Sequence, residues 1–295
     1  MSPLGWIWSA FCLLQGLVVI YLNSYIVFIL WRSLTEDGKR NPVNLIQMVM
    51  GINKITMRCS WIINDVTFWL PEIFDSPCYD ISFVFRAFHI YFSYWLTAWL
   101  CIYYSIFITN SGHRLFLWIK RNLLAFLNQV LFLTGVGSLA IALLAYMWRY
   151  NVFFLRYNST NGTTIEDISL TDLCKTSAII LGSCLPFIGI AISLVVSLSS
   201  LLKHVNNLSQ TSFNVQVHVV VIKAMVLFLI LSLFFFVCYA LTLTKVYKND
   251  NPMYFIIQSL MLIIPTLESI IIIKASPKLR KNFPRWFCFR GTGDG

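Results

Sequence analysis

Seven runs of mostly apolar residues, each long enough to cross a lipid bilayer as a helix, divide this chain of 295 residues. They cover residues 6–31, 43–70, 81–109, 123–147, 178–202, 219–243 and 253–274. A hydrocarbon core of about 30 Å needs about 20 such residues in a helix, and only helices or closed barrels satisfy the backbone there. The runs predict an all-α fold, a bundle of seven transmembrane helices in one domain, followed by a basic tail at residues 275–295.

The composition excludes a soluble globular protein. Hydrophobic residues make up 58% of the chain, charged residues only 12%, and the mean hydropathy is +0.73. A soluble core could not hide so much apolar surface. No basic segment or small-residue cleavage site precedes Trp6, so we expect the first run to be retained as a signal anchor.

Basic residues predict the orientation of the bundle. Fourteen Lys and Arg residues lie at the ends of runs and in the segments on the side of the C-terminus, against six on the side of the N-terminus. Because Lys and Arg concentrate in the cytoplasm, the N-terminus is predicted outside and the C-terminus in the cytosol of a multi-pass plasma-membrane protein. The net charge of +10 then indicates contact with the inner leaflet and a transducer, and no nucleic acid is expected as partner.

Two glycosylation sequons agree with this orientation. Asn158-Ser159-Thr160 and Asn161-Gly162-Thr163 both fall on the predicted outer side, so we expect glycans on Asn158 and Asn161. A third sequon begins at Asn207 on the predicted inner side and is interpreted as a chance match.

The eight cysteines show no metal-ligand spacing, and no metal site is predicted. Cys78 and Cys174 both lie on the predicted outer side, where conditions are oxidising, and form a candidate disulfide. Cys288, just beyond the last run, is either a palmitoylation site or an unmodified cysteine at the membrane interface.

Charged side chains inside the runs are the main candidates for function, because placing a charge in lipid has a high free-energy cost. Lys54, Arg58 and Asp65 share one helical face of the second run, and the seventh run contributes Glu268. Depths estimated from the helical rise of about 1.5 Å per residue bring Lys54 within reach of Glu268. We predict a polar latch of Asn23, Lys54, Glu268 and Ser269 that rearranges on activation. The alternative is a structural pair that never moves.

Several motifs, in order along five runs, are similar to those of the type 2 (bitter) taste receptors. In the third run and just after it they are Trp95-Leu96-Thr97-Ala98, Tyr103-Tyr104 and Leu115-Phe116-Leu117-Trp118-Ile119-Lys120. The later runs add Pro186-Phe187, Ser200-Leu201-Leu202-Lys203-His204, His218 with Lys223, Phe228-Leu229, Pro265-Thr266-Leu267-Glu268-Ser269 and Lys278-Leu279-Arg280. The chain thus resembles that family of G-protein-coupled receptors, as a divergent member. Lys54 and Glu268 stand where the family usually has arginine and histidine, which we interpret as one coupled change.

The resemblance implies an agonist pocket that opens outward between the helices. Its lining would be Asp65, Arg86, Ile90, Tyr91, Tyr239, Gln258 and Met261. Arg86 suggests an anionic or amphipathic agonist, since a guanidinium forks onto carboxylates or sulfates. Alternatively, Arg86 pairs with an aspartate or extends to the membrane surface.

The resemblance also implies a cytosolic face that activates a gustducin-type heterotrimeric G protein. The residues on that side would be Asn110, His113, Lys120, His204 and Lys223. Each of these could instead contact lipid or only set the topology.

Three other classes are alternatives to a taste receptor. A pheromone-type (vomeronasal type 1) receptor has similar size and loops, but the motifs at 200–204 and 265–269 favour taste. A retinal protein would need a lysine in the middle of the seventh run, whereas Lys274 lies at its inner end. A membrane enzyme or transporter would need paired carboxylates, a metal cluster or broken helices, so we predict no enzyme activity and no cofactor.

Overall fold

The computed structural model describes residues 3–36, 41–69, 77–109, 114–157, 173–207, 212–243 and 252–283, and these residues form helices with no strand among them. The helices are α1 (Pro3–Glu36), α2 (Pro42–Trp69), α3 (Pro77–Ile108), α4 (Arg114–Tyr157), α6 (Leu185–Asn207), α7 (Ser212–Leu243), α8 (Pro252–Ala275) and the short α9 (Pro277–Asn282). Before α6, a helical stretch at 173–179 runs into the π-helix η2 (Ile180–Cys184).

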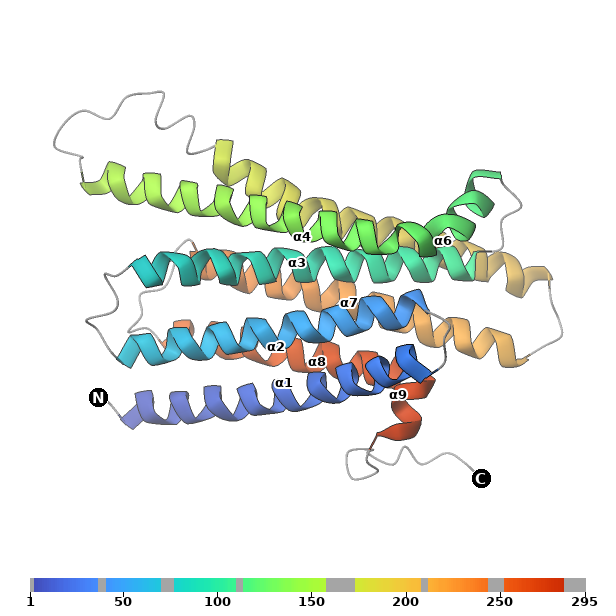
Figure 1. Ribbon diagram of the computed structural model, residues 1–295, viewed down its shortest axis with the longest axis horizontal. Helices are drawn as coiled ribbons and strands as arrows, with labels where there is room; N and C mark the ends of the chain where they lie inside the picture. Colours follow the sequence, from blue (N-terminus) through green and yellow to red (C-terminus); the bar gives the residue numbers. More distant parts are fainter. Residues whose placement is uncertain are drawn as a thin grey trace.

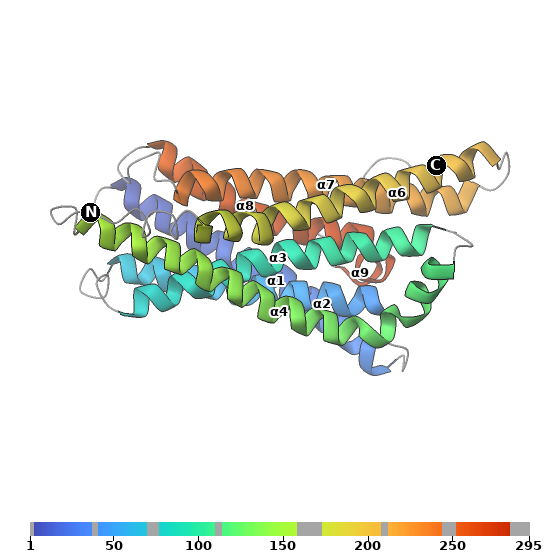
Figure 2. The same cartoon turned by 90° about the horizontal axis from the view of Figure 1, so that it is seen from above.

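The long helices lie side by side along one axis of an elongated bundle (Figures 1 and 2). In the middle of the bundle, α3 contacts α2, α4, α6 and α7, while α1 packs against α2 and α8. The bundle end where α1 begins is called the outer end here, after the predicted orientation. The opposite end carries α9 (Figure 1).

The predicted seven-helix architecture is confirmed, and each predicted run lies within a helical segment to within a residue or so. The helices continue past the runs where polar residues follow. At 44 residues, α4 is the longest. A hydrocarbon core needs only about 20 residues of helix, and the first turns of α4 bend away from the rest of the helix (Figures 1 and 2).

The surface of the bundle carries many exposed apolar side chains, as expected for a protein surrounded by lipid. Large apolar side chains such as Leu17, Phe28, Phe132 and Val195 are more than half exposed. Within the described residues, six helices are apolar enough to cross a membrane by hydropathy. The seventh, α2, is less apolar because it buries Gln47, Asn53, Lys54 and Arg58 inside the bundle.

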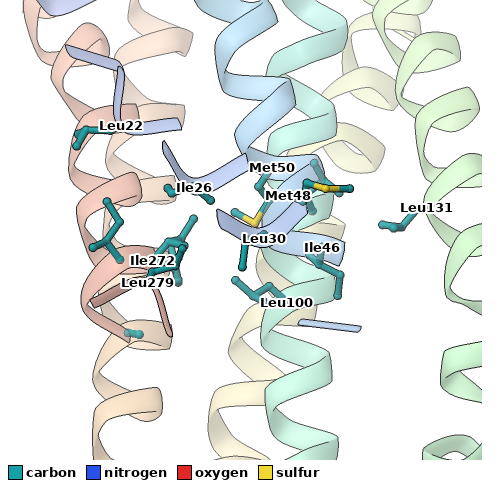
Figure 3. Packing of buried hydrophobic residues seen from close by; sticks show 14 of the residues in the cluster. Leu22, Ile26, Leu30, Ile46, Met48, Met50, Leu100, Leu131, Ile272 and Leu279 are labelled. Carbon is teal, nitrogen blue, oxygen red and sulfur yellow. The ribbon is translucent and has the colours of Figure 1, made fainter. Parts of the chain in front are cut away.

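Apolar side chains of α1, α2, α3 and α8 form the largest core cluster, toward the end that carries α9 (Figure 3). Ile26, Leu30 and Ile46 belong to its fully buried centre. At the base of the cluster, Leu279 of α9 is completely buried. The hydroxyl of Tyr25 donates to the carbonyl of Leu279 at 2.8 Å, which ties α9 to α1.

Glycines allow α1 and α2 to approach closely. A Cβ atom on Gly51 would lie 2.9 Å from Cγ2 of Val27, and one on Gly16 would lie 2.8 Å from Nε of Arg58. Small residues have this role in membrane helix packing because they let backbones come together. The space left by Gly16 takes the guanidinium of Arg58, which donates to the carbonyl of Cys12.

Candidate functional site

A buried ion pair lies at the centre of the bundle. Nζ of Lys54 on α2 is 3.0 Å from Oε2 of Glu268 on α8. Lys54 is only 1% exposed and Glu268 only 7%. Two opposite charges in contact lower the cost of holding either one away from water, so each needs the other here.

The other two latch residues lie close together between α1 and α8. The hydroxyl of Ser269 is 3.0 Å from Oδ1 of Asn23 and 2.8 Å from the carbonyl oxygen of Pro265. The amide of Asn23 donates to the carbonyl of Val19 at 2.8 Å. Pro265 lies inside α8 and has no N–H, so this turn of the helix lacks one backbone hydrogen bond. The structure thus brings all four predicted latch residues to the interface of α1, α2 and α8, while their movement on activation stays a prediction.

A small cavity adjoins the ion pair, and we call it the central cavity. Its volume is about 20 Å³, enough for about one water molecule. It is lined by Lys54, Met57, Ile90, Ser93, Tyr94, Phe235, Ile264, Pro265 and Glu268.

A second cavity, which we call the outer cavity, lies nearer the outer end between α3, α4, α7 and the segment 173–183. Its volume is about 70 Å³. It is lined by Phe83, Tyr91, Ala145, Trp148, Lys175, Ala178, Ile179, Ser183, Phe236, Tyr239 and Ala240. Among these residues Lys175 alone carries a charge, so the wall is mostly apolar with few polar groups. Ligand pockets commonly have this character.

The π-helix η2 shapes one wall of the outer cavity. A Cβ atom on Gly182 would lie 2.5 Å from Cδ1 of Tyr91, so only glycine lets the ring pack against this backbone. The indole of Trp95 donates to the carbonyl of Leu181 at 3.2 Å. A π-helical turn breaks the regular hydrogen-bond ladder, and such turns are frequent at functional sites.

The residues predicted to line one pocket are divided between several places. Tyr91 and Tyr239 both line the outer cavity, whereas Ile90 lines the central one. Gln258 and Met261 are buried on α8 outside both linings. Arg86 is half-buried and belongs to neither lining. Asp65 lies on α2, but its side chain is outside the described part of the structure.

Apart from Tyr91 and Tyr239, the residues that line the outer cavity were not predicted from the sequence, and the largest of them include Trp148, Lys175 and Phe236. From the sequence, Lys175 is only one of the outer charges that help to set the topology. Lys175 comes just before an apolar run, and a cation in that position can face either the membrane surface or the interior of the bundle. The sequence therefore offers the interior position as a possibility but does not select it. Trp148 and Phe236 carry no signal beyond their apolar character.

On the predicted cytosolic side, Lys223 is exposed on α7. Lys120 and His204 lie on α4 and α6, with side chains outside the described set. Four other predicted sites fall in segments that the structure does not describe: Asn110, His113, Asn158 and Asn161. The same holds for Cys288.

The predicted disulfide between Cys78 and Cys174 is not present, because Cys174 is a free thiol. Cys174 is only 5% exposed, which is the usual environment of a cysteine that packs as a small apolar residue. The side chain of Cys78 lies outside the described residues.

Comparisons with known proteins give one consistent result. The family model described as "Taste receptor protein (TAS2R)" matches residues 2–290. Taste receptor type 2 member 41 of Pan paniscus is 23% identical over 281 residues, which cover 92% of this chain and 91% of that protein. Taste receptor type 2 member 9 of Macaca mulatta is 25% identical over 286 residues, covering 92% and 89%. Taste receptor type 2 member 41 of Mus musculus is 24% identical over 291 residues, covering 93% and 94%.

Proposed function

Because the chain belongs to the TAS2R family of taste receptors, we propose that it is a bitter-type chemosensory receptor of the plasma membrane, which binds small organic agonists in the outer cavity. Its cytosolic face activates a heterotrimeric G protein of the gustducin type. The family match disfavours the pheromone-receptor, retinal-protein and transporter alternatives, and receptors of this kind are not enzymes.

One observation carries the proposal: two pairs of neighbouring residues connect the outer cavity to the ion pair. On α3, Tyr91 lines the outer cavity while Ile90 lines the central cavity beside Lys54 and Glu268. On α7, Phe236 lines the outer cavity and Phe235 lines the central cavity. A ligand that displaces either helix at the outer cavity therefore also changes the packing around the ion pair.

Activation would follow from differential binding. An agonist can shift the receptor only as far as it prefers the active arrangement of α3 and α7 over the inactive one. The proposed consequence is a rearranged latch of Asn23, Lys54, Glu268 and Ser269 and a changed cytosolic surface near Lys223. Basic residues on that surface suit a transducer that docks on the inner leaflet.

The test is to fill the outer cavity and measure signalling. Ala145 lines the cavity on α4, whereas Ala140 on the same helix is exposed. The receptor is expressed with a promiscuous Gα subunit, screened with bitter compounds, bile acids and other amphipathic anions, and read out by calcium release. We expect Ala145→Leu to weaken the agonists found by about tenfold or more, because the new side chain occupies the binding volume.

Ala140→Leu is the matched control and should respond like the wild type. Surface staining of both variants shows whether a lost response reflects folding. Equal potency in Ala145→Leu and Ala140→Leu at equal surface level would rule out the outer cavity as the agonist site.

A further inference from the structure

Lys175 is a cation in the wall of a cavity that is otherwise built from uncharged, mainly aromatic and aliphatic side chains. Its side chain is half-buried. A charge beside apolar surface loses part of its hydration, and it gains most from a partner that carries the opposite charge. Among the residues that the structure describes, its partner is an aromatic ring, since Nζ of Lys175 lies 5.7 Å from the centre of the Trp148 ring.

This cation–π contact is a weak attachment. The distance of 5.7 Å is close to the limit of about 6 Å for such contacts, whereas a hydrogen bond between a charged group and its counter-charge is among the stronger polar interactions in proteins. An acid group that enters the outer cavity can therefore take Lys175 away from Trp148.

The size of the cavity also suggests that a ligand separates Lys175 from Trp148. An apolar cavity of about 150 Å³ holds a benzene ring, whereas the outer cavity measures about 70 Å³. A ligand larger than a few carbon atoms needs part of the wall to move. Lys175 and Trp148 come from different segments of the chain and are joined by a long cation–π contact, so this part of the wall can open without breaking a strong polar interaction.

We propose that the outer cavity selects amphipathic anions, in which a carboxylate or sulfonate pairs with Lys175 and a hydrophobic body packs against Trp148, Tyr91 and Phe236. Binding replaces the contact between Lys175 and Trp148 with an ion pair and widens the cavity. This inference rests on the outer cavity being the agonist site, and it moves the anion-binding role from Arg86 to Lys175.

The test compares acids with uncharged analogues of the same shape. The probes are 3-phenylpropionate, 5-phenylpentanoate and the two corresponding primary amides. The variants are Lys175→Gln, which removes the charge, and Lys175→Arg, which keeps it. Lys248→Gln removes one positive charge elsewhere on the predicted outer side and serves as the matched control for long-range electrostatics.

Two readouts are measured for each variant, namely calcium responses in cells and the thermal stability of purified receptor with and without probe. We expect Lys175→Gln to weaken the acids about tenfold to hundredfold relative to their amides, because one charged hydrogen-bonding partner is lost. Lys175→Arg and Lys248→Gln should stay within about threefold of the wild type.

Two results would overturn the inference: an equal loss for acids and amides in Lys175→Gln, or acids that stabilise the wild type no better than amides do. Acid-selective stabilisation that disappears in Lys175→Gln supports the anion site even if no probe evokes calcium. In that case the signalling role fails and the binding site stands.

Discussion

At the scale of single residues, the ion pair between Lys54 and Glu268 is the most demanding feature of the molecule. Both groups are buried and their charged atoms lie 3.0 Å apart. Removing one member of such a pair costs about 3–5 kcal/mol because the other charge stays buried without a counter-charge. That is a large part of the stability of a typical domain.

Exchanging the two charges tests the pair. Lys54→Glu and Glu268→Lys should each reduce the amount of receptor at the cell surface severely, since each places two like charges in contact. The double variant should recover a substantial part of the wild-type level, as measured by surface staining of a tagged receptor. If the double variant stays as low as the single variants, the two residues do not act as a pair.

The polar residues at the centre of the bundle could be predicted from the sequence. Charged and polar residues within apolar runs are expected to face one another, and the structure brings Asn23, Lys54, Glu268 and Ser269 together. Their types and depths carry that information, because lipid leaves them no other environment. The agonist pocket is less predictable. Its wall combines side chains from several helices, and the rotation of each helix decides which ones meet.

At the scale of helices, the contact of α1 with α2 depends on Gly51. Gly51→Val places methyl groups where Val27 already lies, since even a Cβ atom would approach Cγ2 of Val27 to 2.9 Å. We expect a loss of about 1–3 kcal/mol, seen as a lower melting temperature of the purified receptor.

Gly137→Val is the matched control for Gly51→Val, because no atom lies within 4 Å of a Cβ built on Gly137 in α4. Both variants carry the same change in helix propensity. Equal melting temperatures would show that α1 and α2 do not need the close approach.

The π-helix η2 gives a second prediction at this scale. Gly182→Ala forces the ring of Tyr91 to move, since the new Cβ would lie 2.5 Å from its Cδ1 atom. Because Tyr91 lines the outer cavity, agonist potency in the calcium assay should change by about tenfold.

Gly189→Ala in α6 is the control for Gly182→Ala, since its nearest neighbour would be at an ordinary 3.9 Å. Wild-type potency in Gly182→Ala would mean that the ring of Tyr91 does not define the cavity. The sequence did not predict η2, because one extra residue in a helical turn leaves the apolar pattern of the run almost unchanged. The helices themselves were predictable from the lengths of the apolar runs.

At the scale of the whole molecule, function depends on which end of the bundle faces outward. The outer cavity can receive an external agonist only if the end where α1 begins lies outside the cell. Basic residues favour this orientation by fourteen to six. The long helices run from one end of the bundle toward the other (Figure 1). Once one loop is known to lie inside or outside the cell, the locations of all the other loops follow.

Three sequons on different sides of the membrane report this orientation directly, because N-glycans are added only on the lumenal side that becomes extracellular. Enzymatic removal of N-glycans should increase the gel mobility of the wild-type receptor. The double variant Asn158→Gln with Asn161→Gln should lose this shift, and Asn207→Gln should keep it. A shift that depends on Asn207 instead would reverse the orientation, place the outer cavity at the cytosolic end, and exclude it as a site for external agonists.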